Sequence, residues 1–558
     1  MRKHPAFLAP APPPLATLTG RAHVFPVVVR TAIGRRLPSP PGLEELPAGP
    51  GARRFARTWV RELVPLLGLR RPAPRRRLFL IFLDGMGGST LDRAIADGSM
   101  PFLARLVVHP KFRRTEAFSG MPSTTTAFQA GLFYGLRHPD IPGFCWYDRR
   151  TGQKRMMGTP RDAMEVEAEL AARAGPGLFH RGTTYLSILR GGARNYGSTA
   201  GLWPLISGPR LPPLIPADFV GGTWVHLWTA VRVFLRLVTE IPLLLGDILR
   251  FCTWTRWPGL DPNYILNQAV VANLLQEMGR SQVLFDLVRG VERMFYCIHD
   301  YDEVAHRRGP EWARRTLGKI DRRLEYVVSV AAAAPDPPDV WIITDHGQIP
   351  AIPFEGIFGC TLAEWLERTD VEALPETVLE AVGRMRPRPR RENGDMVVVD
   401  SGNYAHVYLS REGPLDARQI VRDHAHVLSR VLACPGIGLA VMRLDDSAIA
   451  FAGGRRVDPD DPRTIPACAE RRALRVFLED LPKTPSAGDI VLFGSWVEDA
   501  CVAFTREYAS HGGLSSEETS IFLVHPAGMA REASAVSHGA DLHPILSELY
   551  GPGPDDPA

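Results

Sequence analysis

The chain has few cysteines, little net charge and no apolar run long enough to cross a membrane. Its seven cysteines include no Cys-x-x-Cys pair, which argues against a zinc ribbon and fits a reducing compartment better than a disulfide framework. A formal net charge of +4 over 558 residues does not indicate nucleic-acid binding. With 45% hydrophobic and 23% charged residues, the composition is that of a globular protein with ample core.

The first 75 residues lack the periodicity of a packed element. A basic start, Met1-Arg2-Lys3-His4, is followed by prolines at positions 5, 10, 12, 13 and 14, which interrupt any apolar stretch before it reaches the length of a signal peptide. We therefore predict a Pro- and Arg-rich, partly disordered leader over 1–75 and a cytoplasmic protein. Within the leader, residues 55–67 have the pattern of a short amphipathic helix, which we expect to pack on the body of the protein rather than on a membrane.

Three apolar runs, each typical of a strand buried on both faces, are followed by a carboxylate. They are residues 78–83 before Asp84, residues 294–298 before the segment 300–302, and residues 340–344 before Asp345-His346-Gly347. In open α/β sheets, ligands bind beyond the carboxyl ends of the strands. We therefore expect Asp84, Asp302 and Asp345 to meet at one edge of a sheet.

Histidines accompany these acids at spacings that suit metal ions. Asp302 and His306 are four positions apart, so on a helix both side chains point to the same side. Asp345 and His346 are adjacent, and on a tight turn after a strand both can reach one cation. His511 is followed by two glycines and an apolar run. Carboxylate oxygen with imidazole nitrogen is a ligand mixture that zinc, manganese or iron accepts, and the whole pattern predicts a two-metal site.

A nucleophile is offered by the segment 121–132. Pro122 and Ser123 are typical of a helix entry, which would place the hydroxyls of Thr124, Thr125 and Thr126 at the positive end of a helix dipole, where phosphate binds readily. A threonine bound to a metal there could ionise near neutral pH. The alternative is that the three threonines only cap a helix.

Five separated motifs resemble, in their order, those of the alkaline phosphatase superfamily, and among its branches the type I phosphodiesterase/nucleotide pyrophosphatase family. The resemblance covers about residues 76–350 and 490–552. Its motifs are Asp84-Gly85-Met86-Gly87, Pro122-Ser123-Thr124-Thr125-Thr126, Asp302-x-x-x-His306, Thr344-Asp345-His346-Gly347 and Ser510-His511-Gly512-Gly513.

The resemblance implies an α/β fold with a mostly parallel central sheet flanked by helices, and two divalent metal ions, zinc or alternatively manganese. It implies that Thr125 is the nucleophile, attacking phosphorus to give a phospho-threonine, with Thr124 and Thr126 as the fallback choices. It also implies the ligands of each ion: Asp84, Thr125, Asp345 and His346 for one, and Asp302, His306 and His511 for the other.

Two departures bear on the substrate. Family phosphodiesterases commonly carry an asparagine that contacts a phosphoryl oxygen at the position of Phe144, whose side chain donates no hydrogen bond. The sulfatase pattern Cys-x-Pro-x-Arg is absent, which argues against sulfate esters.

We therefore expect a metal-dependent hydrolase of a small-molecule phosphoester, with a diester or pyrophosphate as the first choice. A phosphomonoesterase, a phosphonate hydrolase and a lipid head-group phosphodiesterase are the alternatives, and a non-catalytic membrane-associated binding protein is the minor one. The sequence leaves the oligomeric state open.

The core is predicted to comprise residues 76–155, 290–380 and 485–558. Between its parts we expect a helical cap insertion over 156–289 and a small α+β insertion over 381–484. Apolar residues at helical spacing within 219–257 fit either a cap over the site or an interfacial helix that makes peripheral contact with a membrane. His299 and His406 fall in apolar or alternating runs. We expect His299 to be a hydrogen-bonded core histidine and His406 to have a structural or substrate-lining role rather than to bind a metal.

Overall fold

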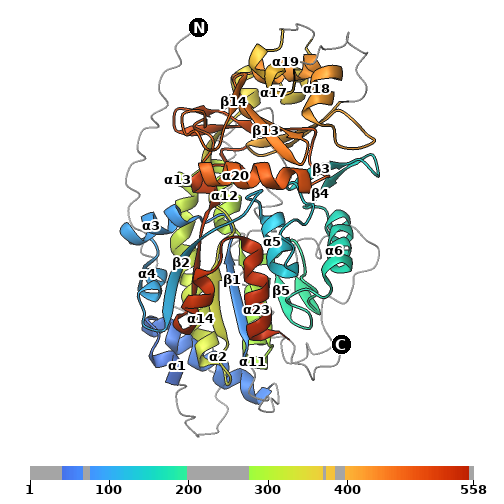
Figure 1. The fold of residues 1–558 in the computed structure, drawn as a ribbon. Helices are drawn as coiled ribbons and strands as arrows, with labels where there is room; N and C mark the ends of the chain where they lie inside the picture. The colour runs from blue at the N-terminus through green and yellow to red at the C-terminus, as the bar shows by residue number, and fades with distance from the viewer. Residues whose placement is uncertain (1–40, 67–75, 198–274, 369–372, 384–395, 552–558) are drawn as a thin grey trace. The chain divides into compact units, whose positions relative to one another are not determined.

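The apolar run Leu78–Leu83 forms strand β1, and all of its residues are buried (Figure 1). It pairs in parallel with β7 (Arg293–Ile298) on one side and with β8 (Asp339–Ile343) on the other. A strand flanked in this way, with helices over both faces, has no side that faces water, which explains the uninterrupted apolar run. The registers bring the carboxyl ends of the three strands to the same edge.

These strands belong to a seven-stranded sheet with the order β2-β19-β8-β1-β7-β5-β6. The five strands from β8 to β6 are parallel, and β19 and β2 add an antiparallel edge. The bounds of the four outer strands are Phe112–Phe118 for β2, Ser520–Pro526 for β19, Thr183–Tyr185 for β5 and Asn195–Gly197 for β6.

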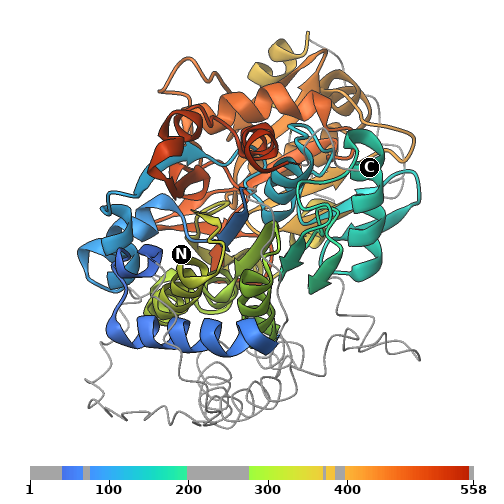
Figure 2. The ribbon, with the colours of Figure 1, turned by 90° about the horizontal axis from the view of Figure 1, so that it is seen from below.

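Helices cover both faces of this sheet, as the view along the strands shows (Figure 2). One face carries α5 (Thr125–Tyr134) and α23 (Leu542–Tyr550). The other carries α2 (Pro50–Leu66), α11 (Gln276–Arg289) and α14 (Leu317–Ala333). The predicted α/β fold, with a mostly parallel central sheet flanked by helices, is therefore confirmed.

This computed structural model describes residues 41–66, 76–197, 275–368, 373–383 and 396–551, all within the unit Ser39–Ala558. The first 40 residues of the predicted leader and the predicted helix at 219–257, with its two interpretations, lie outside the described residues. Within the described ranges, no helix combines the length and the apolar character that spanning a bilayer requires.

Two segments expected to lie outside the core contribute elements to it. Part of the expected leader forms α1 (Pro41–Glu44) and α2, and the expected helix at 55–67 is α2 itself. The ring of Phe55 lies 5.1 Å from that of Tyr326 on α14, so α2 packs on the body. The described ends of the expected insertion 156–289 supply β5, β6 and α11. Strands of three residues carry too little periodicity to be recognised in a sequence.

A second sheet of six strands has the order β10-β11-β15-β12-β13-β14. Its strand β15 lies beyond residue 484, in the segment expected to belong to the core. The hydrogen-bonded partners of β15 are β11 and β12, from the expected insertion. The strands are β10 (Val397–Ser401), β11 (Tyr404–Tyr408), β12 (Ile437–Leu444), β13 (Ser447–Ala452), β14 (Arg455–Val457) and β15 (Ile490–Gly494). Helices α18 (Ala417–Asp423), α19 (Ala425–Ala433) and α20 (Arg471–Asp480) accompany this sheet.

The remaining elements connect or border these two sheets. They are α3 (Gly88–Ala96), α4 (Pro101–Val107), the hairpin β3 (Cys145–Asp148) and β4 (Gln153–Met156), α6 (Pro160–Ala174), α12 (Asp300–Arg308), α13 (Pro310–Ala313), α15 (Phe354–Phe358), α16 (Leu362–Glu367), α17 (Glu376–Ala381), α21 (Ser516–Thr519) and α22 (Ala530–Ser534), with β9 (Ile349–Pro353), β16 (Trp496–Val497), β17 (Ala500–Ala503) and β18 (Ala509–Ser510) in a small third sheet.

Asp321 provides a test of the packing between α14 and α4. Its carboxylate accepts hydrogen bonds of 2.8 Å from the backbone N–H groups of Phe102 and Leu103, in the first turn of α4. Asp321→Ala leaves two buried donors unpaired, so we expect the free energy of unfolding in urea to fall by about 2–4 kcal/mol. Asp92→Ala, which breaks an exposed ion pair with Arg114, should cost less than about 1 kcal/mol. Equal losses in the two variants would contradict this account.

Candidate active site

The three predicted acids meet at the carboxyl edge of the central sheet. Asp84 directly follows β1, Asp345 follows β8 after one residue, and Asp302 lies in the first turn of α12, just beyond β7. Gly85 makes this approach feasible: its φ is +69°, and a Cβ on it would stand 2.4 Å from Oδ1 of Asp302. A residue with a side chain would therefore both strain the turn and displace an acid.

Asp84, Asp345 and His346 form the first Asp/His set, in which each residue offers one ligand atom and these atoms lie within 4.8 Å of one another. Nε2 of His346 is 3.1 Å from Oδ2 of Asp345 and 3.7 Å from Oδ1 of Asp84. Nδ1 of His346 lies 3.1 Å from the carbonyl oxygen of Gly347, to which it can donate. That hydrogen bond makes Nε2 the nitrogen that faces the acids. Although burial opposes it, the charge of Asp345 raises the pKa of His346 to about 9, so Nε2 offers a lone pair to a cation only after giving up its proton.

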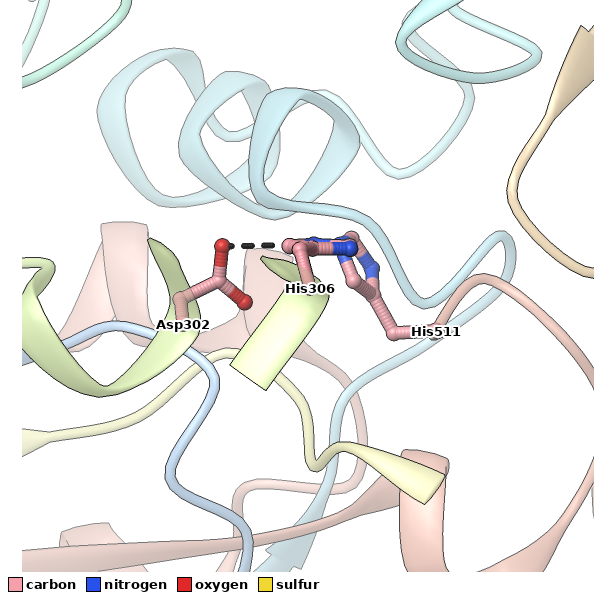
Figure 3. Close-up of side chains that lie close together, drawn as sticks. All are labelled: Asp302, His306 and His511. Atoms are coloured by element: carbon pink, nitrogen blue, oxygen red, sulfur yellow. Dashed lines mark ion pairs between the residues drawn. The ribbon is translucent and has the colours of Figure 1, made fainter. Parts of the chain in front are cut away.

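Asp302, His306 and His511 form the second Asp/His set, by the same distance criterion (Figure 3). The first two are four residues apart on α12, and Nε2 of His306 lies 3.4 Å from Oδ2 of Asp302. The other ring nitrogen of His306 lies 3.0 Å from Oε2 of Glu507, and Nδ1 of His511 lies 3.2 Å from the carbonyl oxygen of Ser123. These contacts fix both ring orientations.

The two sets adjoin through their histidines. The rings of His346 and His511 stack, with centroids 3.6 Å apart and an interplanar angle of 10°. The ring of His306 lies 5.0 Å from that of His511. All six predicted Asp and His residues are therefore brought together in one site.

Thr125 begins α5 beside the first set. Its Oγ1 lies 3.2 Å from Oδ1 of Asp84 and 3.1 Å from Nε2 of His346. Thr124 is the N-cap of α5, and its side chain accepts from the N–H of Ala127, so the capping interpretation applies to this threonine. The hydroxyl of Thr126 donates to the carbonyl oxygen of Gly143, which lies two positions before β3.

A buried carboxylate that the sequence analysis did not single out, Glu518, holds the loop carrying His511. Its Oε1 accepts from the N–H of Gly513 at 2.8 Å and from Nδ2 of Asn403 at 3.0 Å. At Gly512, φ is +99° and a Cβ would stand 2.2 Å from Cε1 of Tyr404. Gly512 is thus required by close packing against β11, and a Cβ on Gly513 would stand 2.6 Å from Nδ2 of Asn403.

The charges and pKa values of the acids and histidines in this site suit the binding of cations. Burial and the charge of Asp345 raise the pKa of Asp84 well above its usual value. Burial and the neighbouring His346 lower the pKa of His511 to about 3, so its ring is neutral and able to act as a ligand at neutral pH. Oδ2 of Asp345 is fully buried, and it lies 3.1 Å from Nε2 of His346. Crowded, buried carboxylates are costly unless positive charge compensates them, and divalent ions would supply it.

Two further polar residues at the second set were missed by the sequence analysis. Glu507 contacts His306, and Nε2 of Gln348 donates to Oδ1 of Asp302 at 2.6 Å. Gln348 comes two positions after His346, and Glu507 four positions before His511. That proximity in the chain is the only signal that could have indicated them.

Phe144, His299 and His406 lie outside the two Asp/His sets. The side chain of Phe144 is 37% exposed, and its N–H donates to the hydroxyl of Tyr404. His406 is buried, with Nε2 3.2 Å from the carbonyl oxygen of Pro142, and Nδ1 of His299 lies 3.0 Å from Gln276. Neither histidine belongs to an Asp/His set.

Comparisons with known proteins add little. No protein-family model and no curated protein matches the sequence. Among solved structures, the chain is similar to phosphonoacetate hydrolase from Sinorhizobium meliloti 1021, in complexes with phosphonoformate and with phosphonoacetate. In both cases the identity is 16%, the TM-score is 0.42, and the match covers 87% of this chain and 98% of the other. A likeness at this level carries no argument about the activity of this chain.

Proposed function

We propose that this protein is a metal-dependent phosphoester hydrolase with Thr125 as its nucleophile, acting on phosphodiester or pyrophosphate bonds. The observation that carries the proposal is the position of the Thr125 hydroxyl, within 3.2 Å of both Asp84 and His346 at the start of α5. A hydroxyl at a helix N-terminus, beside two clusters of Asp and His, suits attack on a phosphoryl group.

The two Asp/His sets would hold two divalent ions, zinc or manganese. Asp84, Asp345 and His346 would hold one together with Thr125, and Asp302, His306 and His511 the other. When bound, such ions lower the pKa of a coordinated hydroxyl and neutralise charge on the phosphoryl oxygens.

The residues of the chain position the reacting groups. The hydrogen bond from Thr125 to Oδ1 of Asp84 directs the hydroxyl proton away from the substrate and leaves lone pairs on Oγ1 for in-line attack on phosphorus. The N-terminus of α5 and its dipole favour a phosphoryl group at the same place. Attack would form a bond from Oγ1 to phosphorus while the bond to the leaving oxygen breaks; the leaving group departs as an alkoxide or phosphate, and the hydroxyl proton goes to Asp84. Water would then hydrolyse the phospho-threonine, releasing the phosphoryl group and restoring the Thr125 hydroxyl.

Phe144 favours a second candidate, a phosphomonoesterase or phosphonate hydrolase. The loop that carries it is adjacent to α5, since Thr126 donates to the carbonyl oxygen of Gly143. A half-exposed phenyl ring offers no hydrogen bond to a phosphoryl oxygen there, whereas the related phosphodiesterases have an asparagine. An apolar substituent of the substrate would fit this side of the site.

Turnover of four substrates distinguishes the candidates. We expect bis(p-nitrophenyl) phosphate or a nucleotide sugar to be hydrolysed with a higher kcat/KM than p-nitrophenyl phosphate or a simple phosphonate. The reverse order of kcat/KM values would replace the diester proposal with the second candidate. If none of the four substrates is hydrolysed, the proposal that the protein is a phosphoester hydrolase is wrong.

Substitution of the three threonines tests the nucleophile. Thr125→Ala should lower kcat/KM by on the order of 10³-fold or more, because the attacking oxygen is lost. Thr124→Ala removes only a helix cap and should act through stability, by about 1 kcal/mol. If Thr125→Ala keeps full activity while Thr124→Ala or Thr126→Ala loses it, the assignment of Thr125 is wrong.

Removal of metal tests the chemistry. Dialysis against a chelator should abolish turnover, and adding back zinc or manganese should restore it, because the phosphoryl charge is then neutralised again. Circular dichroism before and after dialysis separates loss of metal from loss of fold. Unchanged turnover by a chain shown to contain no metal would refute the proposal.

A further inference from the structure

Gln348 lies within the second Asp/His set. It is 3% exposed, and its Nε2 is 2.6 Å from Oδ1 of Asp302 and 3.1 Å from Nε2 of His306. It therefore touches two of the three side chains that the proposed function assigns to one ion, although the resemblance that suggested those three gives it no role.

The oxygen of the same amide has no hydrogen bond. Oε1 of Gln348 is buried and unpaired among the described residues, which is unfavourable for a polar atom. A half-turn about the last side-chain torsion exchanges the amide nitrogen and oxygen. Oε1 then faces Asp302 and His306, and a carbonyl oxygen is a good ligand for hard divalent cations.

The distances within this group have the spacing of a coordination sphere. Two donors that each stand about 2.1 Å from one ion are about 3.0–3.4 Å apart in octahedral or tetrahedral geometry. The contact of Gln348 with His306 measures 3.1 Å and that of Asp302 with His306 measures 3.4 Å. The contact of Gln348 with Asp302 is shorter because it is a direct hydrogen bond.

We propose that Gln348 is a fourth side-chain ligand, through Oε1, of the ion held by Asp302, His306 and His511. This inference rests on the proposed two-ion site. With Gln348, the ion would have two oxygen ligands beside two imidazoles, instead of one carboxylate and two histidines. Oxygen ligands suit manganese, so Gln348 favours manganese over zinc at this position.

Metal binding by the full-length, chelator-treated protein tests this role without relying on activity. Titration calorimetry with manganese should give two sites in the wild type. Gln348→Leu should weaken one of them by about 10- to 100-fold and leave the other unchanged. Gln348→Glu, which keeps an oxygen at this position, should retain both sites and restore the binding that leucine removes.

Controls separate a ligand from a structural residue. Gln153→Leu, at an exposed position on β4, should bind manganese like the wild type, and thermal unfolding without metal should show that both Gln348 variants are folded. If Gln348→Leu binds both ions as the wild type does, or if Gln348→Glu loses as much affinity as Gln348→Leu, the inference is wrong and the proposed function stands. If the wild type binds fewer than two ions, both are wrong.

Discussion

The convergence of three carboxylates, two of them buried and one half-buried, at one edge of a parallel sheet is the constraint on which the rest of the structure depends. Asp84, Asp302 and Asp345 come from three neighbouring strand ends, and burial together with the charges of Asp345 and Asp302 raises the pKa of Asp84. Such an arrangement is unfavourable in a protein that only has to be stable, because buried like charges oppose folding. It is understandable in a protein that holds cations, and the histidines beside the acids, such as His346 at 3.1 Å from Asp345, are part of that pattern.

The surroundings of the acids are shaped to keep them in place. Gly85 lets one strand end approach Asp302, and Glu518 fixes the loop of His511 from behind. Glu507 and Gln348 hold the ring of His306 and the carboxylate of Asp302. Catalytic groups need such support, because a displacement on the order of 1 Å in a reacting group can cost about a hundredfold in rate.

The strands and acids of the core were predictable from the sequence because a doubly covered strand leaves a continuous apolar run, as in β1. The pairing of β5 and of β15 was not, since each hydrogen-bonds to partners far away in the chain. For the same reason the supporting residues were missed: Glu507 is 201 positions from His306, and Gln348 is 46 positions from Asp302. Functional residues that form a short motif in the chain can be recognised in a sequence, whereas residues that come into contact only when the chain folds cannot.

The central claim is that each Asp/His set binds one divalent ion beside Thr125. Crystals of the protein grown with zinc, measured at the zinc absorption edge, test it most directly. The account predicts two anomalous peaks, one in contact with Asp84, Asp345 and His346 and the other with Asp302, His306 and His511. A map with no peak at either set, or with zinc bound only elsewhere on the molecule, would contradict it.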